Sequence, residues 1–423
     1  MSRRTVITGV AVRVPGGAGT KEFWDLISNG RSATRVITRF DPAPYRSQVV
    51  GECDFDPRRE NLSPREIRRM DRTAQLGVVC AREAMADSGL DGSAALNPER
   101  IAVSVGSAIG SPTSLEREYR VLSDDGRRWE VDEDYLSPHM FDFMVPSAVV
   151  KEVAWAVGAE GPAMMISDGC TSGMDAIGHA RDLIAEGSAD IVVAGGTDAS
   201  ISPMVVACFD AIKATTPRTD EPGRACRPFD RSRNGFVLAE GAAMLVLEEY
   251  EHARRRGARI YGEVAGYATR CNAYHMTGLK TDGIEMAEAI RHALDEARAN
   301  TTDIDYINAH GSGTKQNDRH ETAAFKLSLG EHAYRTPVSA IKSMIGHSLG
   351  AIGAIEIVAC ALALVQGVVP PTANLHEPDP ECDLDYVPLT AREAELDTVL
   401  SVGSGFGGFQ SAVVLRGPGK VMA

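Results

Sequence analysis

Residues 163–186 read AMMISDGCTSGMDAIGHARDLIAE, and the order of residue types in this stretch predicts a strand, a turn and a helix. A short apolar run comes first, a glycine permits a sharp turn, and apolar residues then recur near helical spacing. We therefore expect a strand over Ala163–Ser167 and a helix over Ser172–Glu186. The turn between them carries Cys170.

A similar pattern recurs in the second half of the chain. A strand leads there to the turn MIGHSLG (344–350), a long apolar helix follows, and the strand VLSVGSG (399–405) comes after the helix. Each half places a reactive residue at a glycine-containing turn into a buried helix, which indicates internal duplication. We predict two halves, 1–255 and 256–423, with a boundary near Arg254–Gly262. A two-fold arrangement would bring both helix N-termini toward one shared site.

Short β-branched runs alternate with helical patterns along the rest of the chain, which predicts an α/β fold with largely buried sheets. The other expected strands are Val6–Thr8, Ile101–Val105, Ile191–Ala194, Glu263–Tyr267, Ile304–Asn308, Val338–Ser339, Val399–Gly403 and Ala412–Leu415. The other expected helices are Lys21–Asn29, Arg72–Ser88, Gly283–Ala299, Arg319–Leu329 and Leu349–Gln366.

The composition disfavours several classes of function. The 423 residues carry a formal net charge of -14, which argues against a nucleic-acid binder with a broad basic surface. The eight cysteines include no C-x-x-C pair and are sparse for this length, so a reducing cytosol fits better than a disulfide framework. The longest apolar run, Ala351 to Val365, is shorter than a membrane span and contains Glu356, so we interpret it as a buried helix. The short apolar run near the N-terminus ends in Pro-Gly-Gly and indicates a first strand rather than a signal peptide.

Cys170 is the first candidate for chemistry, because it stands where a strand turns into a helix. The unpaired N–H groups and positive end of a helix N-terminus would favour the thiolate, which is the nucleophilic form. The alternative is a small buried side chain without a chemical role, which is our interpretation of the other seven cysteines.

Two histidines stand in glycine-rich turns of the second half. His310 lies in NAHGSGT (308–314), where Ser312 and Thr314 supply hydroxyls at alternate positions. His347 lies in SAIKSMIGHSLG (339–350), five residues after Lys342. Glycines beside a histidine permit close approach of a ligand, so a catalytic role is possible for both, and loop histidines without function are the alternative.

The same region also contains a motif that favours another class of enzyme. Gly346–Gly350 matches the G-x-S-x-G elbow of α/β-hydrolases, which would make Ser348 the nucleophile of a hydrolase or an acyltransferase. The triad would then need a histidine downstream, and only His376 remains there, in a proline-rich loop. This reading is therefore disfavoured.

Two further motifs match a dinucleotide-binding site and a zinc site only in part. Gly403–Gly408 matches G-x-G-x-x-G, but the fifteen residues that follow are too few for a dinucleotide-binding unit. A glycine loop of this kind can instead present backbone N–H groups to a developing oxyanion. His320-Glu321 is not followed by the second histidine of a zincin, and we expect no metal site.

Taken together, the motifs resemble those of the β-ketoacyl synthases of the thiolase superfamily, over nearly the whole chain. Cys170 in GCTSG, His310 in NAHGSGT and His347 in KSMIGHSLGA are similar to that family's Cys-His-His set in order and context. RPFDRSRNGF (227–236) resembles a further family motif, with Asn234 where an aspartate is usual. The resemblance implies a thiolase-like, five-layered αβαβα fold with two pseudo-equivalent halves, the first carrying the cysteine and the second both histidines.

Segments such as VVACFDAIKATT, YATRCNAYHMTGLK and VGSGFGGFQSA are similar to the ketosynthase-alpha subunit of bacterial aromatic polyketide synthases, although SDGC stands here where STGC is expected. The resemblance implies decarboxylative Claisen condensation of malonyl thioesters, with the growing chain on Cys170. It implies that His310 and His347 hydrogen-bond the malonyl thioester carbonyl, and that the remaining site positions support them. Lys342 and Glu321 would organise the two histidines electrostatically. The N–H groups of Cys170 and Phe406 would bind the oxyanion, and Phe406 would also gate the pocket. Ser312 and Thr314 would contact the pantetheine arm.

The resemblance further implies an acyl carrier protein as partner. That protein would bring the phosphopantetheine group, so this chain would need no bound cofactor. Arg65, Arg68 and Arg69 are spaced to share one face of a helix over Ser63–Met70 and could dock an acidic carrier protein, with a solvated surface helix as the alternative.

The resemblance also implies a heterodimer with a homologous chain-length factor, in the cytoplasm. A homodimeric fatty-acid-type synthase is the alternative. A thiolase is disfavoured, because thiolases use a second cysteine near the C-terminus and the Gly403–Gly408 loop has none.

Overall fold

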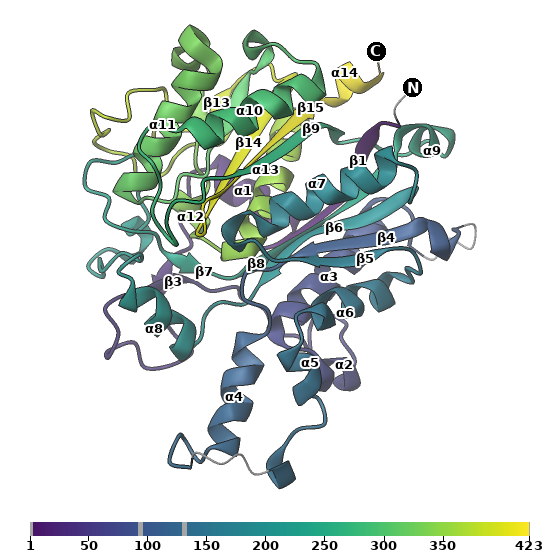
Figure 1. The fold of residues 1–423 in the computed structure, drawn as a ribbon, viewed down its shortest axis with the longest axis vertical. Helices are drawn as coiled ribbons and strands as arrows, with labels where there is room; N and C mark the ends of the chain where they lie inside the picture. Colours follow the sequence, from purple (N-terminus) through teal and green to yellow (C-terminus); the bar gives the residue numbers. More distant parts are fainter. Residues whose placement is uncertain (1–2, 92–95, 129–132, 423) are drawn as a thin grey trace.

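The computed structural model describes residues 3–91, 96–128 and 133–422. Ten of its strands form one continuous sheet that consists of two groups of five (Figure 1). The N-terminal group has the order β5 (Ala163–Ile166), β4 (Ile101–Gly106), β6 (Ile191–Asp198), β8 (Gly241–Glu249) and β1 (Thr5–Arg13). The C-terminal group has the order β11 (Val338–Ser339), β10 (Tyr306–Asn308), β14 (Thr398–Gly405), β15 (Phe409–Arg416) and β9 (Gly262–Cys271).

The two groups repeat one pattern of strand pairing. β4 lies parallel to β5 and β6, and β8 runs antiparallel to both β6 and β1. In the same way, β10 lies parallel to β11 and β14, and β15 runs antiparallel to both β14 and β9. The groups join where β1 pairs with β9, through Val6–Glu263 and Ile7–Gly262. This repetition confirms the expected pseudo-equivalent halves.

Helices complete five layers around these strands. α7 (Ser172–Ala185) and α13 (Ile352–Gln366) pack against each other and against strands of both groups, and so form the central layer. One outer layer consists of α3 (Arg72–Asp87) and α6 (Ser147–Val157), and the other of α10 (Ile284–Ala297) backed by α11 (Lys315–Leu329) (Figure 1). The arrangement confirms the predicted αβαβα fold.

Apolar burial explains the position of the central helix α13. All thirteen residues from Ile352 to Leu364 are buried, and Glu356 is the only charged one among them. Each Ile or Leu side chain that is fully buried stabilises the fold by about 1.5–3 kcal/mol. The stretch Leu349–Gln366 is long and apolar enough to cross a membrane, but 89% of it is buried inside the molecule. It therefore serves as a core helix.

β8, which lies between β1 and β6, was not among the strands predicted from the sequence. All nine of its residues (GAAMLVLEE) are buried, so it lacks the alternation of apolar and polar side chains that marks a half-exposed strand. The other described helices and strands are α1 (Thr20–Ser28), α2 (Pro64–Arg69), α4 (Pro112–Leu122), α5 (Met140–Met144), α8 (Pro203–Ala211), α9 (Tyr250–Arg255), α12 (Lys342–Ile345), α14 (Pro418–Met422), β2 (Arg35–Val36), β3 (Val49–Gly51), β7 (Leu238–Ala239), β12 (Val368–Val369) and β13 (Arg392–Glu393).

Candidate active site

The two repeated turns and the loop after β10 meet at one small cavity. Cys170 lies in η3 (Gly169–Thr171), a 3-10 turn between β5 and α7, and His347 lies just before the equivalent turn η7 (Leu349–Ala351) and α13. His310 follows β10, and its ring lies edge-on to that of His347 with centroids 5.2 Å apart. The cavity encloses about 50 Å³ and is lined by Cys170, His310, His347, Phe406, Ser312, Thr314, Phe209, Phe236, Thr277, Leu279, Gln316, Asn317, Ser404 and Gly405.

The glycine loop after β14 lies against the backbone of the cysteine turn. A Cβ atom on Gly405 would be 3.3 Å from the backbone nitrogen of Cys170, and one on Gly169 would be 3.2 Å from the carbonyl oxygen of Phe406. Side chains at these positions would force the two segments apart. Because they are glycines, the backbone N–H of Phe406 reaches the thiol of Cys170 and lowers the pKa of that thiol. Two backbone donors, those of Cys170 and Phe406, therefore lie close to the sulfur atom.

Both histidines are buried and neutral at physiological pH. Burial lowers the pKa of His310 and of His347 well below the usual value, and the nearby charge of Lys342 acts in the same direction. Nδ1 of His347 accepts a hydrogen bond from the N–H of Leu349 (3.2 Å), so the ring proton is assigned to Nε2. Nδ1 of His310 is buried without a hydrogen-bond partner among the described residues. Neutral rings of this kind can donate a hydrogen bond to a substrate oxygen.

Lys342 and Glu321 hold the backbone of His310 from two sides. Nζ of Lys342 donates to the carbonyl oxygen of His310 (2.5 Å) and pairs with Glu356. Glu321 accepts hydrogen bonds from the N–H groups of His310 and Gly311. Burial raises the pKa of Glu321 to about 8 and that of Glu356 to about 7. The hydrogen bonds of both predicted residues therefore hold the loop that carries His310, and the charge of Lys342 also acts on the two imidazole rings.

Glu356 and two of the three phenylalanines that line the cavity, Phe209 and Phe236, were absent from the predicted site. Glu356 could have been found, because a single carboxylate in a long apolar helix requires a buried partner. Phe236 packs edge-on against His347, with ring centroids 5.2 Å apart, and it ends the RPFDRSRNGF motif. Phe209 lies on α8, a helix that the sequence analysis did not predict.

The cysteine differs from the expectation in its protonation state. Burial raises the pKa of the Cys170 thiol to about 12, and the opposing effects of Lys342 and of the Phe406 N–H are smaller. The predicted stabilisation of the thiolate by the helix N-terminus is thus outweighed by desolvation. Cys170 therefore rests as a thiol at neutral pH.

Ser348, the alternative nucleophile, lacks the surroundings of a hydrolase serine. Its hydroxyl is buried and has no hydrogen-bond partner in the described part of the chain. His376 lies in a different loop, where its backbone N–H donates to Asp230 (2.9 Å). Within the described ranges, no base makes a hydrogen bond to the hydroxyl of Ser348.

The arginines predicted for docking differ in their surroundings. Arg65 and Arg68 are exposed on α2, which begins with a capping box formed by Ser63 and Glu66. Arg69 instead makes two hydrogen bonds, of 2.9 and 2.6 Å, to the buried carboxylate of Glu152. Only Arg65 and Arg68 of the three present an uncommitted positive charge to solvent.

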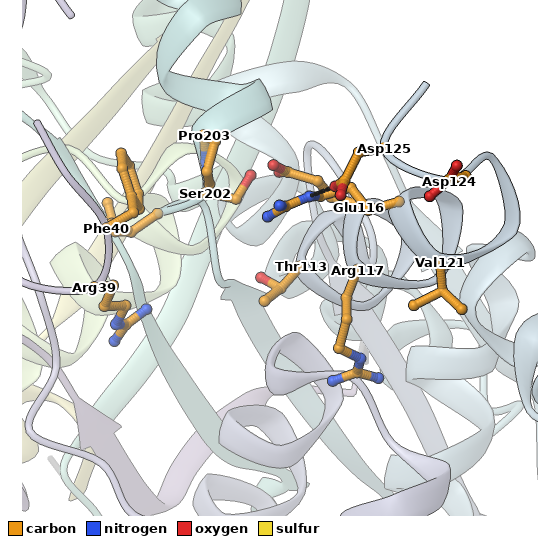
Figure 2. Close-up of a pocket in the computed structure, with 12 residues that line it drawn as sticks. Arg39, Phe40, Thr113, Glu116, Arg117, Val121, Asp124, Asp125, Ser202 and Pro203 are labelled. Carbon is orange, nitrogen blue, oxygen red and sulfur yellow. Dashed lines mark hydrogen bonds and ion pairs between the residues drawn. The ribbon is translucent and has the colours of Figure 1, made fainter. Parts of the chain in front are cut away.

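A larger pocket of about 530 Å³ lies outside this site, between α4, the start of α8 and the segment at Arg39 and Phe40 (Figure 2). Figure 2 shows Arg39 and Phe40 on one side of it and Glu116 and Arg117 on the other. None of its lining residues is Cys170 or either histidine. Among residues 3–91, 96–128 and 133–422, no group of three or more His, Cys, Asp or Glu side chains is arranged to hold a metal ion.

Comparison with known proteins places the chain among described families. Residues 2–253 match the family description "Beta-ketoacyl synthase, N-terminal domain", and residues 261–376 match "Beta-ketoacyl synthase, C-terminal domain". The chain is 65% identical to the tetracenomycin polyketide synthase ketoacyl synthase alpha subunit of Streptomyces glaucescens, over 98% of this chain and 97% of the relative.

Two solved structures are similar over nearly the whole chain. One is a type II polyketide synthase acyl-carrier protein in complex with its ketosynthase bound to the hexaketide, with a TM-score of 0.92, 37% identity and coverage of 99% of this chain and 100% of that chain. The other is the ishigamide ketosynthase/chain length factor, with a TM-score of 0.90, 34% identity and the same coverage.

Proposed function

The chain belongs to the beta-ketoacyl synthase family, and we propose that Cys170, His310 and His347 carry out its decarboxylative condensation of acyl thioesters. The observation that carries this assignment is the meeting of a thiol, two neutral imidazoles and two backbone donors in one cavity. The 65% identity to a polyketide ketoacyl synthase alpha subunit supports a poly-β-ketone product over a fatty-acid product.

Acylation of Cys170 comes first in the proposed reaction. The thiol sulfur attacks the carbonyl carbon of a carrier-bound thioester, and the tetrahedral oxyanion faces the N–H groups of Cys170 and Phe406. The carbon–sulfur bond to the carrier then breaks. The carrier thiol leaves with the proton that Cys170 gives up, so the exchange needs no external base.

Decarboxylation of the malonyl thioester supplies the carbon nucleophile. As the bond to the carboxylate carbon breaks, carbon dioxide leaves and negative charge develops on the thioester oxygen. His310 and the Nε2–H of His347 donate hydrogen bonds to that oxygen, which a neutral ring can do at neutral pH. The enolate carbon then attacks the acyl group on Cys170. The thiolate of Cys170 leaves and regains a proton, and the chain is two carbons longer.

The remaining predicted residues support this chemistry. Lys342 and Glu321 position the loop of His310, and Ser312 and Thr314, which line the cavity, contact the pantetheine arm. Phe406 borders the small cavity, where it would gate the entry of an acyl chain. The phosphopantetheine group belongs to the carrier protein, and this chain requires no further cofactor and no metal.

We propose an acyl carrier protein and a homologous chain-length factor as partners, as in the ketosynthase complexes to which the chain is similar. The exposed edge strand β5 supports a heterodimer, because its Met164 is 50% exposed and its outer backbone groups can pair with a strand of the partner. α6, which packs against β5, also exposes Trp155. Arg65 and Arg68 would meet the acidic carrier protein, and the assembly would work in the cytoplasm.

The test is condensation with malonyl carrier protein in the presence of the partner subunit. We expect C170A to fold and to lose condensation to background, because the acyl group then has no covalent attachment. C208A is the matched control, since Cys208 is an exposed free cysteine that does not line the cavity, and we expect it to keep wild-type activity. Polyketide formation by C170A would contradict the proposal.

A further inference from the structure

Asp198 lies behind the cavity and was not part of the predicted site. It is the last residue of β6 and is fully buried. Its carboxylate accepts hydrogen bonds from the hydroxyl of Ser107 (2.6 Å) and from the backbone N–H groups of Ala108 (2.9 Å), Ile109 (3.4 Å) and Gly350 (2.7 Å). All four donors are uncharged, so the carboxylate acts here as a fixed acceptor rather than as half of an ion pair.

These donors come from both halves of the molecule. Ser107, Ala108 and Ile109 follow β4 in the N-terminal half, whereas Gly350 belongs to η7 in the C-terminal half. The approach is so close that a Cβ atom on Gly350 would lie 2.4 Å from the nitrogen of Ala108 and 2.8 Å from Oδ2 of Asp198. Asp198 thus joins the turn that follows β4 to the turn that carries His347.

The hydrogen bond to Gly350 fixes the peptide unit next to Leu349. Leu349 has a φ of +50°, which is uncommon for a residue other than glycine and needs support from its surroundings. In this conformation the N–H of Leu349 donates to Nδ1 of His347. The N–H of Leu349 therefore donates to the imidazole of His347, and the N–H of the next residue, Gly350, donates to the carboxylate of Asp198.

We propose that Asp198 is a positioning residue that keeps His347 in the tautomer with its proton on Nε2. It does so by anchoring the N–H of Gly350, which holds Leu349 in the conformation that directs its own N–H to Nδ1. This inference rests on the proposed function, in which the Nε2–H of His347 donates to the malonyl thioester. Asp198 itself touches neither the substrate nor the ring.

The first measurement is the tautomer of His347 in the unaltered protein. Imidazole ¹⁵N chemical shifts of histidine-labelled protein, with the His347 signals assigned by their loss in H347N, distinguish protonation at Nδ1 from protonation at Nε2. We expect Nδ1 to be unprotonated. A proton on Nδ1 would overturn the inference, and this result does not depend on any Asp198 variant folding.

The second measurement uses D198N, because asparagine offers one acceptor oxygen and turns two donors toward N–H groups. We expect kcat for carbon dioxide release from malonyl carrier protein to fall at least about tenfold with KM little changed, and the His347 ¹⁵N signals to show mixed tautomers. D230N is the matched control, because Asp230 is also a buried carboxylate that accepts only from uncharged donors, and it does not line the cavity. It should leave the tautomer and carbon dioxide release near those of the wild type.

The outcomes separate this inference from the proposed function. If the wild type neither acylates Cys170 nor releases carbon dioxide, the proposed function fails. If the wild type does both, the inference fails when folded D198N keeps the wild-type rate and tautomer, or when D230N shifts both as strongly as D198N.

Discussion

The turn at Cys170 and the turn at His347 occupy equivalent places in the two halves, yet their surroundings differ. Each lies in or beside a short 3-10 turn that leads into a central helix. β5, which precedes Cys170, is an exposed edge strand, and its residues 163–166 are exposed or half-buried. β11 forms the opposite edge of the sheet, and both of its residues are buried, as is every residue from 338 to 350.

This difference indicates how a duplicated architecture can serve one reaction. The turn of Cys170 follows the edge strand that we propose for pairing with the partner subunit, so its surroundings would be completed by that subunit. The turn of His347 must stay dry, because burial is what keeps both rings neutral and able to donate hydrogen bonds. The structural repeat brings the two turns together at one cavity. The difference in burial separates the turn of Cys170, which follows an exposed strand, from the turn of His347, which is buried throughout.

The strongest way to disrupt the buried side is to remove Lys342. K342A leaves the carboxylate of Glu356 without its partner, and we expect a loss of about 3–5 kcal/mol in the free energy of unfolding. K151A is the control, because Lys151 is partly exposed beside Asp142 and its loss should cost about 0–1 kcal/mol. Urea titration of both variants measures the difference. Equal losses of unfolding free energy in K342A and K151A would contradict a larger stabilising role for the buried Lys342–Glu356 pair.

Removal of the imidazole of His347 should separate the two chemical steps. We expect H347A to slow carbon dioxide release from malonyl carrier protein by about 10²–10³-fold, because one donor to the developing enolate is lost. Acylation of Cys170 should fall far less, since its oxyanion faces backbone N–H groups. S348A, the neighbouring control, should retain at least about half of the activity. Rapid-quench assays of the two steps decide between this pattern and a uniform loss.

A change on the cysteine side should alter the pH dependence of stability. Burial and the neighbouring carboxylate of Asp175 raise the pKa of Asp168 to about 8, whereas an aspartate in the unfolded chain ionises near pH 4. Between these values the folded state binds a proton that the unfolded state does not. The contribution of Asp168 to the free energy of unfolding therefore falls as the pH rises toward 8 and is constant above it.

D168N should remove this contribution, so that its unfolding free energy declines less steeply than that of the wild type between pH 4 and 8. D175N is a second test, because it removes the negative charge that Asp168 faces, while its amide oxygen can still accept from the hydroxyl of Tyr267, and it should therefore lower the pKa of Asp168. Identical pH slopes for D168N and the wild type would contradict the raised pKa of Asp168.

The smallest effect is expected at the surface. R68E should raise the KM for acyl carrier protein by roughly three- to tenfold at low salt without a change in kcat, because Arg68 would act only in docking. R335E is the control, since Arg335 is equally exposed but lies on the C-terminal half. Titration with carrier protein at two salt concentrations measures both. An unchanged KM in R68E would remove α2 from the docking surface.

The sequence predicted the fold where the local pattern was strong. The strand, turn and helix around Cys170 begin and end within one residue of the expected positions. β8 escaped prediction because burial of every residue removes its periodicity, and the exposure of β5 could not be inferred from its apolar residues.

Prediction of the site was limited in a similar way. The resemblance identified six of the residues that line the cavity, but local sequence cannot reveal how strongly desolvation acts on a thiol, and burial raises the pKa of Cys170 where a helix N-terminus alone would lower it. Asp198 gave no signal at all, because its partners are backbone N–H groups distant in sequence.

The most direct test of the account is to locate the covalent acyl group. The protein and its partner subunit are incubated with an acyl carrier protein thioester, the intact mass is measured, and the adduct is mapped on the digested chain. We predict one acyl group on Cys170 and none on C170A. An acyl group on Ser348, or no adduct on a folded and partnered wild-type protein, would contradict the assignment of Cys170 as the nucleophile.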